Sequence, residues 1–382
     1  MRILTICAYT WSIGGPAKFI YDQTEVALAK GHQVDILSPV SPGDEVYPAP
    51  PGARVITCLR TTPISRFFRE FSVALYQFLR AHIHDYDIIL CHGLWHFGSI
   101  APFLLDRTIP KVVTIHGLLD PWAYRQGYWK KQLMSVLLQK RLLRRADLIH
   151  VLTPDEQQDL LRFLGRPHPN VAVIPNGIRV ADFAELPPKG TFRRQFNLPD
   201  NKHIVLFMSR LNYKKGLDLL LPAFQRYIQE AGTAVLVLAG PDDGYQQTAQ
   251  AFINQHNLAD QIRMVGMLTG ETKKAALADA DIFVLPSYSE GFSMVVLEAM
   301  AAGVPTLLSD RVGFAAAIRQ QEAACLVDLT IDSVADGLKK LLHNSTYRER
   351  TRQQALHLVR NHYDLDAVAG RLLDEYQKIL RP

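Results

Sequence analysis

Short apolar runs alternate with helical patterns along nearly the whole chain. The runs are rich in Val, Ile and Leu and are bounded by turn residues, which is typical of buried strands. Near-continuous apolar strands separated by helices form parallel sheets covered on both faces. We therefore predict an α/β fold in which a doubly wound, Rossmann-like sheet occurs twice. The predicted strands lie near residues 2–8, 33–37, 54–58, 87–91, 111–115, 148–152, 171–174, 203–208, 233–239, 262–265, 281–285, 304–308 and 324–327.

The length of the chain and one turn-rich segment divide these strands into two domains. With 382 residues, the chain exceeds the roughly 250–300 residues that one hydrophobic core usually serves. The segment IPNGIRVADF (174–183) contains a Pro-Asn-Gly turn signal. We predict a first domain over residues 1–176 and a second over residues 177–363. If the two domains face each other, a central cleft borders the carboxyl ends of their strands, where open α/β sheets bind ligands.

Composition narrows the class of protein further. The net charge of +5 is too mild to indicate nucleic-acid binding. The four cysteines lie far apart without a Cys-x-x-Cys pair, so neither a zinc site nor a disulfide framework is indicated, and a reducing cytoplasm fits. The apolar run after Met1 is too short for a signal peptide or a membrane span. We expect a cytoplasmic protein, either free or at the inner face of a membrane.

Two glutamates mark the turn and helix that follow the fourth strand of the second domain. The stretch PSYSEGFSMVVLEAMAAG (286–303) places Glu290 in the turn and Glu298 inside an otherwise apolar helix, predicted over about residues 293–302. A buried carboxylate is costly unless a partner satisfies it. A nucleotide-sugar offers two pairs of hydroxyl groups, one on the sugar and one on the ribose, so each glutamate has a suitable partner. The alternative is that Glu298 pairs with a neighbouring arginine and Glu290 faces solvent.

The start of this helix and the first turn of the second domain carry groups that suit phosphate. Ser293 is predicted to cap the helix, whose free N–H groups favour an anion. Arg210 and Lys215 flank the turn after the strand at 203–208, where two cations suit a diphosphate. A solvated cation pair in a loop explains the same turn equally well.

Two further turns of the second domain suit the approach of a ligand to the backbone. Gly240 lies in AGPDDG (239–244), where the absence of a Cβ leaves room for a ligand. Met267 and Leu268 lie in VGMLT (265–269), which could hold a flat base through backbone contacts. An ordinary polar turn is the alternative for AGPDDG, and the signal in VGMLT alone is weak.

Three histidines follow strands of the first domain. His116 comes after KVVTI and precedes Gly117, so we expect it to point toward the cleft. His92 holds the equivalent place after DIILC, and His96 follows four residues later. For His92 and His96, the sequence favours a structural role or a polar contact on the acceptor side.

The sequence favours a site without a catalytic metal. Asp-x-Asp pairs occur at 85–87, 279–281 and 364–366, as chance alone produces in a chain with this many acidic residues. Asp279 and Asp281 straddle the end of a helix and the start of a strand, so they are badly placed to share an ion on the cleft side.

Two segments of the first domain are basic and amphipathic. They are ISRFFREFSVALYQFLR (64–80) and YWKKQLMSVLLQKRLLRR (128–145). Such faces can lie on anionic lipid. The pattern favours the alternative, in which both are crossover helices that pack on their own sheet. Contact with a membrane surface stays open, since a lipid-linked acceptor would require it.

Four motifs together resemble a known family. Glu-x(7)-Glu from Glu290, ending in EAMAAGVP, resembles the signature of family 4 of the retaining glycosyltransferases, which have the GT-B fold. SRLNYKKG (209–216) resembles the Arg-x(4)-Lys phosphate motif of that family, WSIGGPAKFI (11–20) its glycine-rich first turn and TIHGLLDPW (114–122) its histidine turn. The resemblance covers nearly the whole chain, and the subtype is similar to bacterial exopolysaccharide transferases, including cyanobacterial heterocyst-envelope enzymes.

The resemblance implies roles for individual residues. Glu290 would hold sugar hydroxyls, Glu298 the ribose, and Arg210 with Lys215 the leaving diphosphate, while His116 would lie near the transferred sugar. The residues that would bind substrate also include Gly14, Gly15, Gly240, Met267, Leu268, Gly291, Phe292, Ser293, Met294 and Val295.

The resemblance also implies the reaction. A hexose, with glucose as the best guess, would move with retention from a uridine diphosphate sugar to a glycan or lipid-linked acceptor in polysaccharide biosynthesis. No metal or other cofactor and no nucleic acid would take part. The last helix, within residues 364–382, would cross back to the first domain.

Three other functions were weighed against transfer. A nucleotide-sugar epimerase of the same fold would need acid–base groups in the cleft and no acceptor. A non-catalytic protein that binds nucleotide-sugars would not need Arg210, Lys215, Glu290 and Glu298 together. A dinucleotide enzyme would need Gly-x-Gly-x-x-Gly after the first strand, and IGGPAKF does not supply it.

Overall fold

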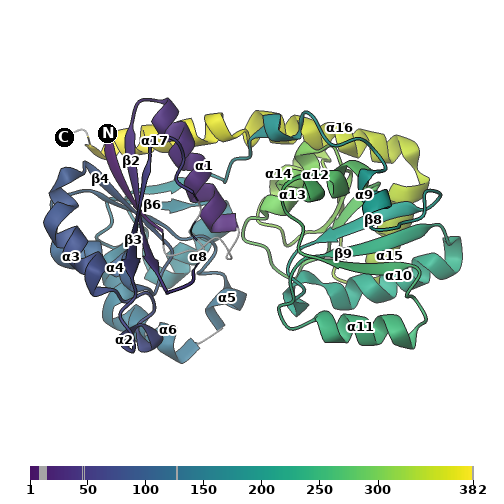
Figure 1. Ribbon diagram of the computed structural model, residues 1–382, viewed down its shortest axis with the longest axis horizontal. Helices are drawn as coiled ribbons and strands as arrows, with labels where there is room; N and C mark the ends of the chain where they lie inside the picture. Colours follow the sequence, from purple (N-terminus) through teal and green to yellow (C-terminus); the bar gives the residue numbers. More distant parts are fainter. Residues whose placement is uncertain (8–14, 45, 47, 126–127, 381–382) are drawn as a thin grey trace. The chain divides into compact units, whose positions relative to one another are not determined.

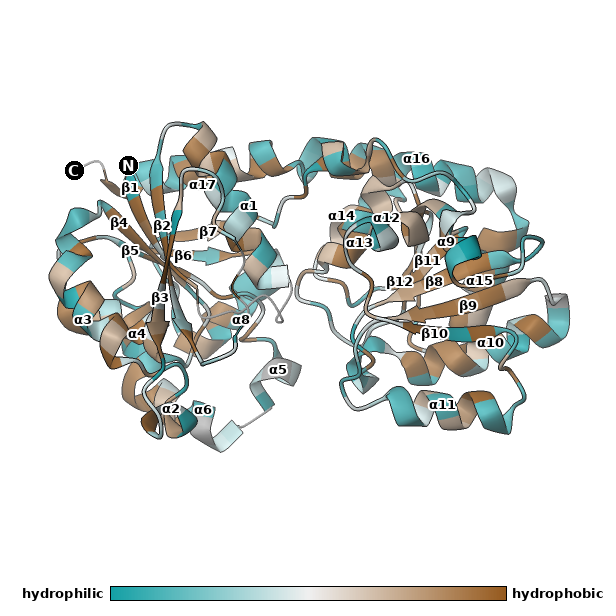
Figure 2. Cartoon of the chain, in the orientation of Figure 1, coloured by the Kyte–Doolittle hydropathy of each residue, from teal (hydrophilic) through white to brown (hydrophobic). Residues whose placement is uncertain are grey.

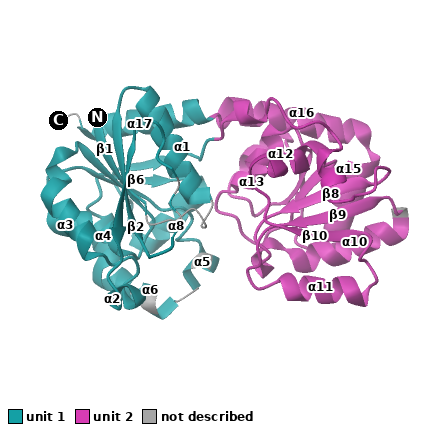
Figure 3. Cartoon of the chain, viewed as in Figure 1, with its two compact units in different colours: residues 1–177, 365–382 teal, residues 178–364 magenta. Residues whose placement is uncertain are grey.

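The computed structural model describes residues 1–382 except 8–14, 45, 47, 126–127 and 381–382 (Figure 1). The chain forms two compact units (Figure 3). Unit 1 comprises Met1–Gly177 and Leu365–Pro382, and unit 2 comprises Ile178–Asp364. The division falls inside the Pro-Asn-Gly segment that the sequence singles out.

Each unit is built on one parallel sheet, and every strand that the sequence predicts is present. The sheet of unit 1 has the order β3-β2-β1-β4-β5-β6-β7, and that of unit 2 has the order β10-β9-β8-β11-β12-β13. The strand order reverses between β1 and β4 in unit 1 and between β8 and β11 in unit 2, as in doubly wound folds. The strands are β1 (Arg2–Ile6), β2 (Gln33–Val40), β3 (Arg54–Leu59), β4 (Ile88–His92), β5 (Lys111–Thr114), β6 (Leu148–Val151), β7 (Val171–Val173), β8 (His203–Met208), β9 (Ala234–Ala239), β10 (Ile262–Gly266), β11 (Ile282–Leu285), β12 (Thr306–Ser309) and β13 (Cys325–Val327).

Helices connect the strands and cover the sheets. In unit 1 they are α1 (Gly15–Ala29), α2 (Ile64–Phe67), α3 (Val73–His82), the 3-10 turn η2 (Ile83–Asp85), α4 (Phe97–Leu105), α5 (Pro121–Arg125), α6 (Tyr128–Met134), the π-helix η3 (Ser135–Gln139), α7 (Lys140–Leu143), α8 (Pro154–Leu164) and α17 (Leu365–Leu380). In unit 2 they are the 3-10 turn η4 (Val180–Phe183), α9 (Thr191–Gln195), the 3-10 turn η5 (Tyr213–Lys215), α10 (Leu217–Ala231), α11 (Gln246–Gln255), α12 (Gly270–Asp279), α13 (Met294–Ala301), α14 (Ala315–Gln321), α15 (Ile331–His343) and α16 (Ser345–His362).

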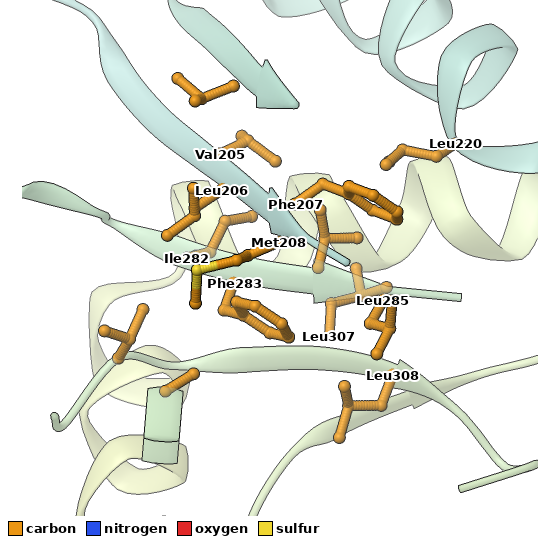
Figure 4. Packing of buried hydrophobic residues seen from close by; sticks show 14 of the residues in the cluster. Val205, Leu206, Phe207, Met208, Leu220, Ile282, Phe283, Leu285, Leu307 and Leu308 are labelled. Carbon is orange, nitrogen blue, oxygen red and sulfur yellow. The ribbon is translucent and has the colours of Figure 1, made fainter. Parts of the chain in front are cut away.

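Apolar strands form the centre of each unit (Figure 2). In unit 2, Phe207 and Phe283 are fully buried on the neighbouring strands β8 and β11, and Leu220 of α10 belongs to the same cluster (Figure 4). Strands that are covered on both faces can be apolar at successive positions, which is why these runs do not alternate with polar residues.

The last helix completes unit 1. Helix α17 packs on α1, and Val368, Leu372 and Tyr376 are buried in the same apolar cluster as Phe19. Gly177 lies against the start of this helix, where a Cβ would come within 2.7 Å of the Leu365 Cα. A side chain at position 177 would therefore push the end of the Met1–Gly177 segment away from α17.

Each of the two amphipathic segments of unit 1 buries some apolar residues and exposes others, and in the first of them Phe67 of α2 is 86% exposed. In α3, Leu75 and Leu79 are fully buried, as the crossover-helix alternative predicts. In the segment from α6 to η3 that prediction is wrong for one face, because Trp129 and Leu137 are 82% and 68% exposed. Among the helices in the described residues, none is both long and apolar enough to cross a membrane.

Candidate active site

Lys215 and Glu290 form an ion pair at the carboxyl edge of the sheet of unit 2. Lys215 ends the turn after β8, and Glu290 lies in the turn after β11, so the parallel pairing of these strands brings together residues far apart in the sequence. The Lys215 ammonium donates to Glu290 Oε1, and the side chains are only 12% and 10% exposed. Ser287 Oγ donates to the same oxygen at 3.1 Å. The alternative in which Glu290 faces solvent is therefore wrong.

The backbone on both sides of Glu290 is fixed. Its N–H donates to the Arg311 carbonyl at 3.0 Å, and its own carbonyl accepts from the Gly313 N–H at 2.8 Å. Gly216, directly after Lys215, has φ +72°, and a Cβ there would meet the Pro286 carbonyl oxygen at 2.0 Å. The glycine lets the Lys215 turn approach the Glu290 turn closely.

Glu298 is buried on α13 and only half satisfied. Lys273 of α12 donates to Glu298 Oε1 at 2.6 Å. The other oxygen, Oε2, is buried and has no hydrogen-bond partner among the described residues. The sequence offers an arginine as the alternative partner, and the structure supplies a lysine 25 positions away instead. A buried oxygen without a donor is costly, so it marks a place where a ligand hydroxyl would be favoured.

Arg210 lies in the same β8–η5 turn but is more exposed. Its Nη1 donates to Asp243 Oδ2 at 2.6 Å, and the side chains are 64% and 38% exposed. Asn212 Nδ2 donates to the same carboxylate oxygen at 3.2 Å. Asp243 belongs to the AGPDDG turn, in which the sequence singles out only Gly240.

The other residues that the sequence predicts in the turns of unit 2 differ in how far they are exposed. A Cβ on Gly240 would lie 1.9 Å from the Ser209 carbonyl oxygen, so this glycine serves close approach of two chain segments. Met267 is 59% exposed and Leu268 is buried. Phe292 packs its ring on Phe314 at a centroid distance of 5.0 Å and is partly exposed.

The start of α13 has no side-chain cap. Ser293 occupies the N-cap position and Met294 begins the helix, but the Ser293 side chain makes no capping hydrogen bond. The predicted position of the cap is therefore right and its predicted hydrogen bond is wrong. Val295 in the first turn of the helix and Gly291 in the turn before it are partly exposed.

An aromatic pair that the sequence does not reveal stands beside the Lys215 turn. Tyr213 and Tyr288 stack with ring centroids 5.3 Å apart and an angle of 11° between the rings. The Tyr288 hydroxyl donates to Asp218 Oδ2 at 2.7 Å. Burial raises the pKa of Tyr288, and the bond to Asp218 raises it further. The stacked rings join the turn after β8 to the turn after β11, in addition to the Lys215–Glu290 ion pair.

In unit 1, His116 lies at the carboxyl end of β5 and is joined to His92. The two rings are linked by a hydrogen bond of 3.0 Å between His92 Nδ1 and His116 Nε2. Burial lowers the pKa of His116 to about 3, with the neighbouring His150 adding to the shift. His116 is therefore a neutral imidazole at neutral pH. It adopts φ +57°, a conformation uncommon for residues other than glycine and often retained at functional sites.

His92 and His96 have structural roles. His92 is 3% exposed, which rules out the suggested acceptor-side contact for its ring in this structure. His96 caps α4, since its Nδ1 accepts from the Ser99 N–H at 3.2 Å and its Nε2 donates to the His92 carbonyl at 2.8 Å. Phe19 of α1 packs edge-on against His116 with ring centroids 5.6 Å apart. Of the glycines in the first turn, Gly15 begins α1, while Gly14 lies outside the described residues.

Glu156 holds the backbone of the turn at His116, although no sequence motif points to it. Its carboxylate accepts from the Gly117 N–H through Oε1 and from the Leu152 N–H at 2.6 Å through Oε2. Burial raises its pKa to about 7, and the two N–H donors offset part of that rise. Glu156 lies on α8, well after His116 in the sequence, so only the tertiary structure brings the two residues together.

The Asp-x-Asp pair at 279–281 has structural bonds. Asp279 accepts from the Arg193 N–H at 2.9 Å, and Asp281 accepts from the Ile204 N–H at 2.8 Å. Within the described part of the chain, no three His, Cys, Asp or Glu side chains are grouped as metal ligands would be.

Comparison with known proteins identifies the family. Residues 14–177 match the family model described as glycosyl transferase 4-like domain, and residues 188–357 match that of glycosyl transferases group 1. The phosphatidyl-myo-inositol mannosyltransferase of Mycobacterium leprae is 27% identical over 402 residues, covering 99% of this chain and 97% of that protein. The D-inositol 3-phosphate glycosyltransferase of Corynebacterium diphtheriae is 28% identical over 382 residues, covering 92% of this chain and 88% of that protein.

Solved structures agree on the fold. The sucrose-phosphate synthase of Thermosynechococcus elongatus superposes with a TM-score of 0.82 at 21% identity, with 99% of each chain covered. Anabaena HepE, solved in complex with UDP and glucose, superposes with a TM-score of 0.79 at 16% identity, covering 99% of this chain and 100% of that chain. The two family matches span nearly all of the chain, and its two parallel-sheet units have the architecture of these structures. The chain therefore belongs to the family 4 glycosyltransferases and has the GT-B fold.

Proposed function

We propose that this glycosyltransferase moves a hexose, with glucose as the first choice, from a uridine diphosphate sugar to a glycan or lipid-linked acceptor, with retention of configuration and without a metal. The observation that carries the proposal is the buried, unpartnered Oε2 of Glu298, on the helix that follows the turn in which Glu290 pairs with Lys215. HepE, which has the same fold, was solved with UDP and with UDP-glucose. Exopolysaccharide synthesis is the process that the motif resemblance favours.

Glu298 is the group proposed to hold the ribose. Its Oε1 is held by Lys273, so the carboxylate has a fixed orientation before any ligand arrives. Oε2 lacks a donor, and a ribose hydroxyl would supply one. A hydrogen bond to a charged acceptor contributes about 1.5–3 kcal/mol, more than one between neutral groups.

Lys215 and Arg210 are the groups proposed to hold the diphosphate. Each is paired with a carboxylate in the ligand-free protein, Lys215 with Glu290 and Arg210 with Asp243. A diphosphate would therefore have to draw both cations from, or share them with, these carboxylates. Charge on the diphosphate grows as the sugar leaves, so the cations stabilise the transition state more than the bound donor.

The proposed chemistry at the sugar is front-side displacement. The bond from the anomeric carbon to the diphosphate oxygen breaks, and the acceptor hydroxyl oxygen bonds to the same face of that carbon. The acceptor proton passes to the leaving diphosphate, which acts as the base. Once Lys215 turns partly toward the diphosphate, Glu290 would accept hydrogen bonds from sugar hydroxyls.

The proposal is tested by binding and by product analysis. Titration calorimetry against a panel of uridine, guanosine and adenosine diphosphate sugars should give binding with the uridine donors. The configuration at the anomeric carbon of donor and product, read from proton coupling constants, should be the same. Inverted product would contradict retention, and a new sugar epimer formed from donor alone would favour the epimerase alternative.

The two glutamates are expected to separate nucleotide binding from sugar binding. Glu298→Gln keeps the size of the side chain and removes its charge, so affinity for free UDP should fall roughly ten- to hundredfold, in line with one charged hydrogen bond. Glu290→Gln should leave that affinity unchanged or raise it, because Lys215 loses its competing partner, while the apparent KM for the donor rises. Calorimetry with UDP and steady-state kinetics distinguish the two.

The matched control for this pair is Glu271→Gln. Glu271 lies on α12 with Lys273, and its carboxylate pairs with Lys274 on the exposed side of the helix. This variant should bind UDP as the wild type does. Weaker UDP binding by Glu290→Gln with normal binding by Glu298→Gln would show that the two roles are exchanged.

Binding and turnover are expected to continue in the presence of a chelator. The proposed charge partners of the diphosphate are Arg210 and Lys215, which do not depend on an added ion. UDP affinity and transfer rate should therefore be the same with EDTA as with magnesium or manganese. Loss of both with EDTA, and recovery on adding either ion, would overturn the metal-free part of the proposal.

A further inference from the structure

The exposed face of the segment from α6 to η3 is apolar. The large apolar side chains that it exposes are Tyr128 (42%), Trp129 (82%), Leu133 (62%), Val136 (64%) and Leu137 (68%). Trp129 and Leu133 are four residues apart, as are Leu133 and Leu137, so they lie along one side of the helix. We call Trp129, Leu133, Val136 and Leu137 the α6 ridge. Contiguous exposed apolar side chains mark an interaction surface.

The buried face of the same segment is polar at two positions, which fixes the side that faces outward. The Trp95 indole Nε1 donates to Ser135 Oγ at 3.1 Å. The Trp95 backbone N–H donates to Gln139 Oε1 at 3.1 Å. Ser135 and Gln139 are 1% and 2% exposed. Ser135 and Gln139 attach this segment to unit 1, so packing within the unit does not explain the apolar residues on its outer side.

The surroundings of the α6 ridge are basic. Residues 121–146 contain no Asp or Glu. They contain seven basic residues, which are Arg125, Lys130, Lys131, Lys140, Arg141, Arg144 and Arg145. Arg141, Arg144 and Arg145 are exposed and directly follow the ridge. This excess of positive charge is complementary to an anionic surface and opposes pairing with a second copy of the same ridge.

Helix α2 adds to the same side of unit 1. Phe67 is 86% exposed and Ile64 is 47% exposed. The Lys131 ammonium of α6 lies 4.9 Å from the centroid of the Trp95 ring, and the Phe97 N–H donates to the Arg69 carbonyl at 2.9 Å, so α6 and the chain just after α2 meet the same short segment of unit 1. Figure 1 draws α2 beside α6. The apolar and basic features therefore extend over two neighbouring helices.

We propose that the α6 ridge and its flanking arginines form a docking surface for a membrane that carries anionic lipids. The apolar side chains would lie at the boundary between headgroups and acyl chains, where Trp is favoured, and the arginines would contact lipid phosphates. The contact is peripheral, since no helix among those described could span the bilayer. The surface goes beyond the proposed transfer reaction, and if that proposal holds, it would bring unit 1 to a lipid-linked acceptor.

The proposal is tested by flotation of the full-length protein with vesicles. Wild type should float with vesicles of equal parts phosphatidylcholine and phosphatidylglycerol and should not float with phosphatidylcholine alone. The ridge variant Trp129→Ser/Leu133→Ser and the charge variant Arg141→Glu/Arg145→Glu should each bind at least about tenfold more weakly. Added salt should weaken wild-type binding, because it screens the arginines.

The matched control is Leu104→Ser, which removes an exposed leucine of α4 whose exposure of 60% is close to the 62% of Leu133. This variant should float as wild type does, and thermal melting should show that every variant is folded. Failure of wild type to bind the anionic vesicles would overturn the proposal, as would ridge variants that bind normally. Self-association of wild type that the ridge variants abolish, with no lipid binding, would assign the surface to a second copy of the chain instead.

Discussion

Replacing Lys215 with alanine is expected to lower turnover by roughly a hundred- to thousandfold, the scale found when one preorganised electrostatic group is removed from a site. In the proposed reaction Lys215 meets the charge that grows on the diphosphate. Donor affinity should fall as well, because some charge is present in the ground state, but by less than turnover. Steady-state kinetics and calorimetry with UDP measure the two effects separately.

The substitution also leaves Glu290 buried without its cation, which by itself costs roughly 3–5 kcal/mol of stability. The double variant Lys215→Ala/Glu290→Gln removes that charge, so a normally stable double variant that turns over more slowly than Glu290→Gln alone would separate the catalytic role of Lys215 from folding. Lys214→Ala, in the same turn, is the matched control and should keep near wild-type turnover. Wild-type rates for Lys215→Ala would remove this residue from the diphosphate site.

Arg210→Ala should act in the same direction as Lys215→Ala and less strongly. The guanidinium is more exposed than the Lys215 ammonium, and solvent screens an exposed charge. The ranking of the two variants therefore follows from burial, which the sequence does not contain.

Replacing His116 with alanine is expected to lower turnover about a hundredfold or more, the scale of one well-placed polar catalytic group. The family resemblance assigns this residue to the transferred sugar, and the proposed role of its neutral ring is a hydrogen bond to a sugar hydroxyl in the transition state. Affinity for free UDP should hardly change, because the residues proposed to bind the nucleotide belong to unit 2. Because the pKa of His116 is about 3, this ring should add no inflection to the pH profile of kcat near the ordinary histidine value, about 6.5.

Two further variants separate the imidazole from the backbone that carries it. His116 adopts φ +57°, which alanine tolerates poorly, whereas asparagine is more often found there. His116→Asn should therefore fold well and still lose turnover. His84→Ala, at an exposed histidine of the same unit, is the control. If His116→Asn and His116→Ala were both active, the turn would only shape the site.

The bond between His92 and His116 changes the expectation for His92. From the sequence, His92→Ala would act, if at all, on the apparent affinity for the acceptor. In the structure His92 is buried and its ring is hydrogen-bonded to the His116 ring, which it would hold in place, so a loss of turnover is expected instead. The sequence places both residues at strand ends but does not say that their rings meet.

The fold was predictable because its signal is local. Each strand is a short apolar run, as in β11. In a sheet covered on both faces, such a run can be recognised in the sequence without knowing which strands lie beside it. The segment from α6 to η3 shows the limit of that reasoning. Its periodicity is the same whether the apolar face is buried or exposed, and only the bonds from Trp95 to Ser135 and Gln139 decide the direction.

The sequence by itself determined the architecture, the family and the positions of the charged groups at the ends of strands. Which of those groups meet was decided by the tertiary structure alone. Lys215 and Glu290, 75 residues apart, pair because the parallel strands β8 and β11 bring their turns to one edge of the sheet. Lys273 and Glu298, 25 residues apart, pair between helices α12 and α13. Hydrophobic periodicity is read along one segment, whereas burial, pairing and the pKa of a side chain depend on atoms contributed by distant segments, so the unpartnered oxygen of Glu298 and the neutral ring of His116 exist only in the folded chain.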